Sequence, residues 1–458
     1  MVRKRRRSIL RSLTSIAATA GLVSVGAFGS SVAPASAADL DKGSAQFSGT
    51  VRNYGAYVSG SAVFGVLDAR ANISESVVTA NSAGLSKYAG TGPDSFALPR
   101  EVAENPDSRV YARATPIAAG AVGFPIEIVN AQAYSTTKIP TARQNQNGIN
   151  LDLGPIGQFK GFDGSAESNW TDNVLSKGGT LGRAEQNTGS LEFLRYIPLA
   201  QIILDQIPGV QDAFPGLRAN LGQSSSEVKL VSAATATCPD ALAVESTASW
   251  NFADARIFNG LASLSWGGDA IGEAGEITVR ANGRPGGAVV EQSKMPTMQI
   301  EAFGKVIAKL DPGLSVELDR IFEGGSPLAM AIRALVNGQL TYGGTTNEVA
   351  EGDGTRATAS MNGLNVEFQL LNVKAPFTGW DIGSAAWGSF GVERADLEVT
   401  MGAGGLNGGP NCDEEQDASA DPDADADPDA SADADAGVNA NAAASAAASA
   451  KADDDSNA

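Results

Sequence analysis

Side chains alternate in type along residues 242–252, and this alternation constrains the fold more than any other feature of the sequence. One set of alternate positions is Leu242, Val244, Ser246, Ala248, Trp250 and Phe252, and the set between them is Ala243, Glu245, Thr247 and Ser249. Successive side chains of a β-strand point to opposite faces, so a period of two predicts a half-buried strand. The pattern recurs at 276–281, 363–371 and 392–401. We therefore expect residues 236–260 to be mostly extended and the later part of the chain to form sheets.

Shorter β-prone runs separated by glycine fill the earlier part of the chain, at residues 46–51, 57–63, 109–115, 124–134 and 148–153. Asn147-Gly148 and Asn282-Gly283 suit two-residue hairpins, and residues 351–354 suit another turn. Aromatic residues make up only 6% of the chain, which favours sheets faced with small side chains over helices with bulky seams. The expected fold class is mainly β, with antiparallel sheets arranged as a sandwich or meander and a few docked helices.

Two segments break the β pattern. Ser326-Pro327 has the residues typical of a helix start, apolar residues follow on one face up to Val336, and Asn337-Gly338 suits the helix end. A helix over 326–336, docked on a sheet, is therefore expected. Residues 191–221 form a second, apolar segment, whose most apolar part lies between Pro198 and Pro208. We favour a buried helical turn at the end of a sheet there, with a lipid-facing wedge as the alternative.

The first 37 residues predict export from the cytoplasm. Residues 3–7 are basic and residues 16–28 are mildly apolar. Ala35-Ser36-Ala37 provides the small residues that a signal peptidase reads, so cleavage is expected between Ala37 and Ala38. The apolar stretch is shorter than the roughly 20 residues that a spanning helix needs. Arg6-Arg7 suits the twin-arginine route, and the alternatives are an ordinary secretory signal with surplus charge and a retained anchor.

The length of the chain, 458 residues, is enough for two or three domains of about 100–200 residues each. We expect a signal peptide at 1–37 and a β-rich domain at 38–225 that contains the short apolar helical segment. A second β-rich domain, with the amphipathic helix, is expected at 226–409. Residues 410–458 are rich in Asp and Ala and are expected to form a disordered acidic spacer.

Composition excludes several classes of function. The chain contains no histidine, which removes Ser-His-Asp and Cys-His nucleophiles, His-ligated zinc and the commonest general base near neutral pH. Its net charge of −19 disfavours nucleic acid and anionic membrane surfaces as partners. No motif indicates a phosphate-binding loop or a nucleophile elbow, so no cofactor is expected.

Two cysteines, Cys238 and Cys412, are the whole cysteine content of the chain. A single pair in an exported protein favours one disulfide, and two unpaired thiols are the alternative. The bridge would attach the start of the acidic segment to the β-rich body.

Acidic and aromatic residues give weak candidate sites. Asp163, Glu167 and Asp172 lie within ten residues of one another and could ligate calcium, but they lack the full spacing of a calcium loop. We therefore interpret this segment as a solvated loop. The five tryptophans could stack on sugar rings, and burial is the commoner fate of tryptophan in a chain with so few aromatics. They are Trp170, Trp250, Trp266, Trp380 and Trp387.

After Gly409 the sequence changes to alternating Asp and small residues, then to Ala-rich repeats that end in Asp-Ser-Asn-Ala. A basic leader, a histidine-free β body and such a spacer resemble the actinobacterial choice-of-anchor surface proteins, the choice-of-anchor G type above all. The stretches 340–346 and 357–364 carry part of the resemblance. It implies a surface protein that ends in a sorting motif and an apolar helix. Neither is present here, so we expect either release of the protein or a longer natural chain.

The expected function is that of an exported cell-surface or envelope protein with a non-enzymatic structural or adhesive role. Its partner is expected to be a component of the cell envelope or a surface ligand, with no nucleic acid and no transmembrane segment in the mature chain. One alternative is a secreted carbohydrate-active hydrolase, which needs two carboxylates about 5–10 Å apart but no histidine. Another is a carrier that holds an apolar ligand between a sheet and its helices.

Overall fold

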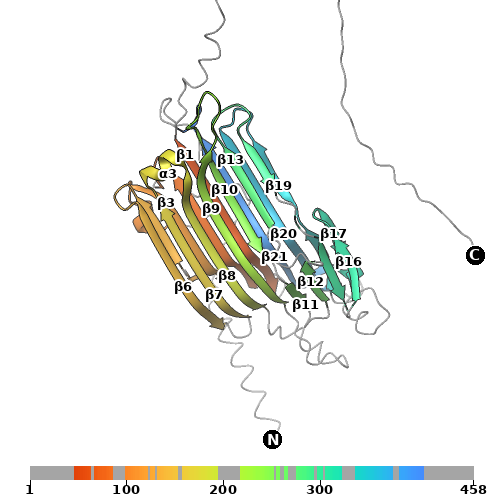
Figure 1. The fold of residues 1–458 in the computed structure, drawn as a ribbon. Helices are drawn as coiled ribbons and strands as arrows, with labels where there is room; N and C mark the ends of the chain where they lie inside the picture. The colour runs from red at the N-terminus through yellow and green to blue at the C-terminus, as the bar shows by residue number, and fades with distance from the viewer. Residues whose placement is uncertain are drawn as a thin grey trace, which may run out of the picture. The chain divides into compact units, whose positions relative to one another are not determined.

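The computed structural model describes the body of the chain between residues 46 and 406, with gaps. The described residues are 46–62, 67–85, 98–121, 124–128, 131–152, 157–193, 217–251, 254–257, 262–266, 275–292, 295, 297–302, 305–321, 336–374 and 381–406. These residues form two large antiparallel sheets (Figure 1), which confirms the expected fold class.

Sheet A contains strands from both ends of the body. They are β1 (Phe47–Ala62), β2 (Leu67–Asn81), β3 (Ser108–Ala121), β4 (Phe124–Ile128), β5 (Ala131–Thr136), β17 (Leu314–Glu317), β18 (Val336–Tyr342), β19 (Thr345–Ala350), β20 (Arg356–Lys374) and β21 (Asp381–Met401). In sheet A the order is β17-β18-β20-β21-β1-β2-β3-β4, while β19 pairs with β20 and β5 with β3.

Sheet B contains the strands between them. They are β6 (Thr141–Asp152), β7 (Gly157–Asn169), β8 (Gly179–Phe193), β9 (Leu217–Ser232), β10 (Leu242–Asn251), β11 (Asp254–Ile257), β12 (Ala262–Trp266), β13 (Gly275–Ala281), β14 (Val289–Gln292), β15 (Met298–Ala302) and β16 (Lys305–Leu310). Three short helices, α2 (Arg100–Ala103), α3 (Asp172–Lys177) and α5 (Leu318–Ile321), complete the described elements.

The strands form one antiparallel meander that passes from sheet A to sheet B and back. The chain crosses between the sheets after β5 and again after β16. The last strand then pairs with the first, in a register that runs from Phe47↔Met401 to Ala62↔Ala386. The first and last strands of the body therefore lie side by side, and Phe47 and Met401 lie at the same end.

The expected strand alternation is confirmed in β10. Its residues Val244, Ser246, Ala248 and Trp250 are buried, and the residues between them are partly exposed. The same alternation marks β13. Residues 351–354 form the expected turn between β19 and β20.

Both Asn-Gly predictions are wrong as two-residue hairpins. Asn147-Gly148 lies inside β6, where Gly148 takes a positive φ of 77° at an irregularity of the pairing with β7. Asn282-Gly283 begins the longer connection between β13 and β14. An Asn-Gly pair indicates a residue with positive φ, and such a residue occurs in a β-bulge or a longer loop as well as in a two-residue turn.

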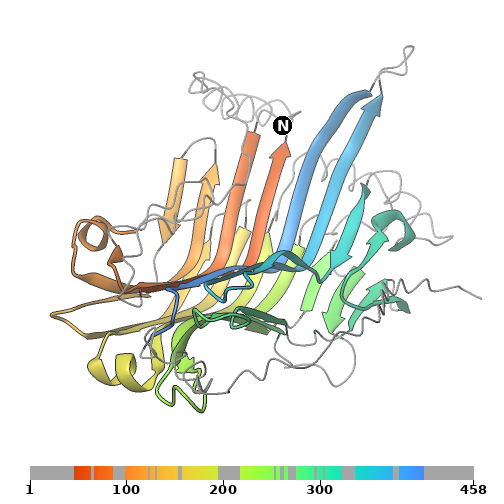
Figure 2. The ribbon, with the colours of Figure 1, turned by 90° about the horizontal axis from the view of Figure 1, so that it is seen from above.

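Small side chains let the two sheets pack closely as two layers (Figure 2). A Cβ added to Gly49 of β1 would lie 2.6 Å from Val228 of β9. A Cβ added to Gly182 of β8 would lie 2.6 Å from Val78 of β2. Glycines therefore hold the places where the opposite sheet comes nearest.

A seam of polar side chains crosses the centre of this interface. The Ser76 and Ser226 hydroxyls lie 2.8 Å apart, and the Ser224 hydroxyl donates to the Ser74 carbonyl at 2.9 Å. Asn53 Nδ2 donates to the carbonyls of Ser225 and Ser249. Buried polar groups need such partners, and each satisfied bond contributes about 0.5–1.5 kcal/mol net. The seam therefore fixes the register of one sheet on the other.

The pairing of sheet A is irregular next to the seam. Tyr54 pairs with Glu75 and Ala56 with Ile73, and the Gly55–Ser74 pair between them is missing from an otherwise continuous register. Ser74 has a φ of 56°, a left-handed conformation that costs a non-glycine residue about 1–2 kcal/mol. Its close neighbour is Gly55, on which a Cβ would lie 2.7 Å from the Ser74 Cβ.

The body is one unit, so the expected division into domains 38–225 and 226–409 is corrected. The boundary falls inside β9, which pairs with β8 and β10 on both sides of that position. The described residues between 46 and 406 all belong to one compact unit. A meander that closes on its own first strand cannot be cut in the middle without breaking both sheets.

Several predictions lie wholly or mainly outside the described residues: the signal peptide, most of 191–221, the spacer and the helix at 326–335. The expected end of that helix is described, and it is extended: Val336, Asn337 and Gly338 begin β18 and pair with β20. No helix among the described residues is long and apolar enough to cross a membrane.

Candidate functional site

The most unusual polar cluster of the described body lies on the face of sheet A that points away from sheet B. It consists of Arg52 on β1, Glu75 on β2 and Arg113 on β3, three neighbouring strands. Arg52 and Arg113 stand opposite Val77, and Glu75 stands two residues before Val77 on the same face. This diagonal placement brings both guanidinium groups within reach of one carboxylate.

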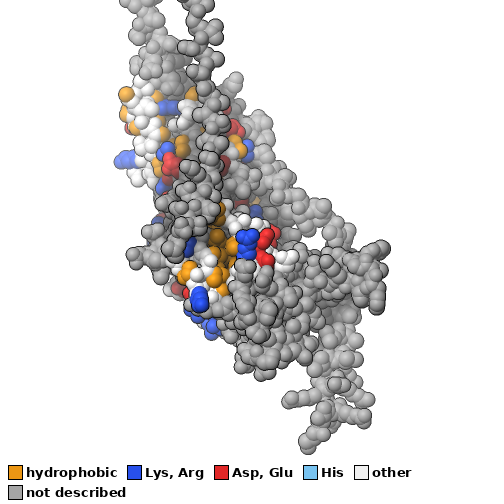
Figure 3. Space-filling model, turned by 90° about the vertical axis from the view of Figure 1, so that its right-hand side faces the viewer, with side chains coloured by type: hydrophobic (Ala, Val, Ile, Leu, Met, Phe, Trp, Pro, Cys, Tyr) orange, Lys and Arg blue, Asp and Glu red, His pale blue; other side chains and the backbone are white. Residues whose placement is uncertain are grey.

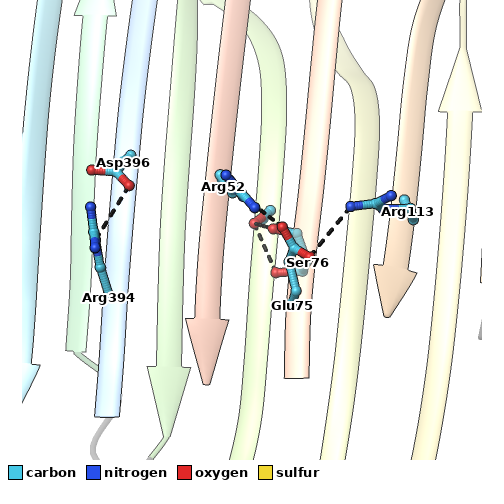
Figure 4. A network of polar contacts seen from close by, with 7 residues as sticks. Arg52, Glu75, Ser76, Arg113, Arg394 and Asp396 are labelled. Atoms are coloured by element: carbon cyan, nitrogen blue, oxygen red, sulfur yellow. Dashed lines mark hydrogen bonds and ion pairs between the residues drawn. The ribbon is translucent and has the colours of Figure 1, made fainter. Parts of the chain in front are cut away.

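The geometry is that of a buried ion triad (Figure 4). Arg52 Nε lies 2.6 Å from Glu75 Oε1, and Arg113 Nη2 lies 3.3 Å from Glu75 Oε2. The Glu75 side chain is 0% exposed, and those of Arg52 and Arg113 are 12% and 5% exposed. Two cations therefore surround one anion in a site with little solvent, where charges interact more strongly than at the surface.

Tyr54 completes the cluster on the Arg52 side. The Arg52 guanidinium carbon lies 4.7 Å from the centre of the Tyr54 ring, a cation–π arrangement. Burial raises the pKa of Tyr54 well above its ordinary value, because the phenolate would lose its hydration. Burial alone would lower the pKa of Arg52, but attraction to Tyr54 and Glu75 outweighs it and the pKa is raised. Arg52 is therefore a permanent cation.

A second polar group lies further along the same face, on β1, β20 and β21. Tyr57 Oη donates to Asn365 Oδ1 at 2.8 Å, and the Ser389 hydroxyl bonds to the same oxygen at 3.1 Å. Asn365 Nδ2 donates to Glu367 Oε1 at 3.1 Å. Burial raises the pKa of Tyr57, so its hydroxyl stays protonated as a donor. This group is half-buried to exposed, in contrast to the Glu75 triad.

Arg394 and Asp396 of β21 connect the two groups. Arg394 Nε lies 3.6 Å from Asp396 Oδ2, and the Arg394 guanidinium carbon lies 6.0 Å from the centre of the Tyr57 ring. Both side chains are about one-third exposed, at 35% and 31%. The outward face of sheet A thus grades from a buried triad to exposed polar side chains, which we call the sheet A polar face.

Two acids of the sheet A polar face, Glu75 and Asp396, lie on strands that are not neighbours. Asp396 pairs with Arg52 and Glu75 with Tyr54, so the two acids are two strands and two residues apart. Standard sheet spacings place their Cα atoms about 12 Å apart. Figure 4 shows Arg52 between them. The chemistry that these residues support is ion pairing and hydrogen bonding of polar groups.

The structure separates the three acids at 163–172. Asp163 and Glu167 lie on β7 and Asp172 begins α3, so the expected loop is a strand followed by a helix. Asp163 Oδ1 accepts a hydrogen bond from the Gly148 amide at 2.8 Å, which ties it to the bulge of β6. Within the described ranges, no three acidic or sulfur side chains gather as metal ligands do.

Two of the tryptophans are described at the side-chain level, and both pack against the core. Trp250 is 2% exposed, and Trp170 is partly buried with its ring stacked on Phe47 at 5.8 Å. Trp266 lies on β12 opposite Met298, and Trp387 lies on β21 opposite Ser61. Trp380 lies outside the described residues.

Of the two cysteines and the two residues at the predicted signal cleavage, the structure describes only Cys238. Cys238 is 1% exposed, in the connection between β9 and β10, and Cys412 lies outside the described residues. The Leu242 amide donates to the Leu406 carbonyl at 3.0 Å, so the chain passes close to this connection six residues before Cys412. The disulfide stays a prediction. Ala37 and Ala38 also lie outside the described residues.

The side of the molecule that carries β16 and β17 mixes hydrophobic and charged side chains (Figure 3). Val306, Ile307 and Leu314 are 53%, 41% and 49% exposed there. Lys305 and Lys309 flank the first two on β16. Charged residues on an edge strand discourage pairing with other chains, so this edge resembles a protected sheet edge.

The sequence did not reveal the Glu75 triad. Its members are far apart in sequence, and a single buried glutamate in a polar strand has no local signature. One signal in the sequence could have indicated part of it. If β1 and β2 are predicted to pair as a hairpin, their register places Arg52 diagonally opposite Glu75 on one face.

Taken together, the described residues define an all-β protein: a two-layer antiparallel sandwich closed by its first and last strands. No protein-family model matches the chain, and no curated protein matches it. Among solved structures it is weakly similar to Pseudomonas aeruginosa OccK2 (OpdF) in complex with glucuronate, at 9% identity and a TM-score of 0.11. That match covers 79% of this chain and 100% of the other. A second OccK2 (OpdF) structure gives 9% identity, a TM-score of 0.10, and 79% and 99% coverage. Likeness at this level carries no argument about function.

Proposed function

We propose that this protein is exported and acts at the cell surface or in the envelope, in a non-enzymatic structural or adhesive role. The observation that carries the proposal is the pairing of β1 with β21, from Phe47↔Met401 onward. The basic leader and the Asp/Ala-rich segment then both join the body at one end. We place the partner's contact with the body away from this point of attachment.

The sheet topology suits a protein under load. A pull applied through the C-terminal segment reaches β21, which is hydrogen-bonded along its length to β1 on one side and β20 on the other. Force along the strands loads many of these bonds at once, because they lie perpendicular to the pull. A surface protein that holds a partner needs this resistance.

The exposed part of the sheet A polar face is the proposed contact surface. Tyr57, Asn365, Glu367 and Arg394 present an aromatic ring, an amide and both charges in fixed positions. Tyrosine and arginine are enriched at recognition surfaces, since they combine apolar area with directional hydrogen bonds. A polar envelope polymer or a surface glycan is the class of partner that this chemistry suits.

Location and binding are tested separately. Intact producing cells are treated with protease and immunoblotted for the full chain, and the culture medium is blotted in parallel. We expect either loss of the surface-exposed protein on protease treatment or detection of released protein in the medium. A chain found only in the cytoplasmic fraction would refute the proposed location.

Binding is tested with purified protein on isolated envelopes. The variant Tyr57→Ala/Asn365→Ala should lose most of the retained protein, at least about fivefold. A matched control is Thr247→Ala/Thr278→Ala, which removes a hydroxyl pair 3.0 Å apart on the outward face of sheet B. Equal retention of the two variants and the wild type would refute the proposed contact surface. The same result would leave the proposed location standing.

A further inference from the structure

One arginine of the described body, Arg284, is buried without a counter-charge. It lies in the connection between β13 and β14 and is 8% exposed. Within the part of the chain that the structure describes, Nε and Nη2 of Arg284 are buried and have no hydrogen-bond partner. A buried guanidinium without a partner costs several kcal/mol, so folded proteins rarely keep one unless something binds it.

Three connections interlock around Arg284 and hold its backbone in place. The Gly283 amide donates to Gly354 O at 2.9 Å, and the Gly404 amide donates to Gly283 O at 2.8 Å. The Arg284 amide is capped by Asn282 Oδ1 at 2.9 Å. A Cβ on Gly283 would overlap the carbonyl oxygen of Gly402, so no larger residue fits there. The position of Arg284 is therefore set by the fold before any ligand arrives.

The two acids of the neighbouring turn are already engaged elsewhere. Asp353 Oδ1 accepts bonds from the Thr355 amide and hydroxyl at 3.0 and 2.7 Å. These bonds lower the pKa of Asp353, since they favour its charged form. Glu351 Oε1 lies 3.8 Å from Arg356 Nη1. The turn that packs on Arg284 thus satisfies its own carboxylates and leaves the arginine without one.

A nearby arginine shows what the unpartnered edge can bind. Nε and Nη2 lie on the same edge of a guanidinium group and donate in parallel directions. Arg356 directs these two atoms at Oε1 of Glu398, each at 3.0 Å. The corresponding atoms of Arg284 are the two that lack partners. Carboxylate is the group whose two oxygens best match this pair of donors.

We propose that the Nε–Nη2 edge of Arg284 is a binding site for one carboxylate group. The source of that chemistry is a free or polymer-borne carboxylate from outside the chain.

The test uses the full chain, labelled with ¹⁵N-arginine, and follows the guanidinium Nε–H signals by NMR. Arg284→Lys assigns the signal, and Arg320, which is 72% exposed, provides the control arginine. Sodium acetate is titrated against sodium chloride at equal ionic strength. We expect the Arg284 signal to shift in a saturable way with acetate alone, and that of Arg320 to shift weakly without saturation.

If acetate produces no saturable shift of the Arg284 signal, the proposal is overturned. That result needs no folded Arg284 variant, because the signal can also be assigned from backbone connectivity in the wild type.

Discussion

Removing the Glu75 charge is the sharpest test of the sheet A triad. The substitution Glu75→Gln keeps the shape of the side chain and removes the negative charge that Arg52 and Arg113 both contact. The Glu75 side chain is 0% exposed, so water does not replace the lost charge unless the sheet opens.

The magnitude follows from the two distances. At an effective dielectric constant of about 20, charges 2.6 and 3.3 Å apart attract by about 6 and 5 kcal/mol. Desolvation of three charges offsets most of this attraction, and breaking a buried pair leaves a net cost of about 3–5 kcal/mol. We expect Glu75→Gln to lower the free energy of unfolding by that amount.

Urea unfolding of the purified chain, monitored by tryptophan fluorescence, measures this loss. The control Glu104→Gln removes an ion pair whose side chains are 85% and 63% exposed, and it should cost less than about 0.5 kcal/mol. The loss for Glu75→Gln should persist in 1 M salt, because buried charges are poorly screened. A loss below about 1 kcal/mol, or one abolished by salt, would refute the buried triad.

Gly222→Ala should cost at least about 1 kcal/mol more than Gly148→Ala in urea unfolding. Both glycines have a positive φ, but only the Cβ at 222 would overlap a backbone carbonyl. Above pH 10 the free energy of unfolding should fall less steeply with pH in the variant Tyr54→Phe than in the wild type. The folded state raises the pKa of Tyr54, so the unfolded chain releases its proton first and stability falls by about 1.4 kcal/mol per pH unit. Urea unfolding at pH 9 to 11 measures this dependence, and equal slopes of unfolding free energy against pH for the variant and the wild type would contradict the prediction. Mass spectrometry of non-reduced peptides should find Cys238 linked to Cys412. Breaking this disulfide should lower the free energy of unfolding by up to about 5 kcal/mol. Finding both cysteines as free thiols would contradict the prediction.

Strand identity was predictable because it depends on local pattern. The alternation at 242–252 predicts β10, and from Val244 onward the buried positions of β10 are the ones that the pattern indicated, while Ala243 is buried as well. Alternation is a property of one strand and needs no knowledge of its neighbours. The turn at 351–354 was predictable for the same reason, since its glycines and acids act within a few residues.

The predictions that failed depend on partners distant in sequence. Nothing near residue 225 distinguishes a domain boundary from the middle of a strand, and β9 is recognised as continuous only when β8 and β10 pair with it. Asn147-Gly148 signalled positive φ correctly, but the choice between a turn and a bulge depended on how β7 pairs with β6. Val336 and its neighbours joined β18 because β20 offered hydrogen bonds to them.

By itself, the sequence determined that the body would be β-rich, that its faces would carry small side chains, and that histidine chemistry would be absent. These properties follow from residue type and local period. The tertiary structure alone decided that the meander closes on its first strand and that Ser76 meets Ser226 across the sheets. It also decided that Glu75 lies between two arginines and that Arg284 lies buried with no acidic partner among the described residues. Each of these depends on register between strands up to hundreds of residues apart, and a shift of one residue would turn the same side chains to the opposite face.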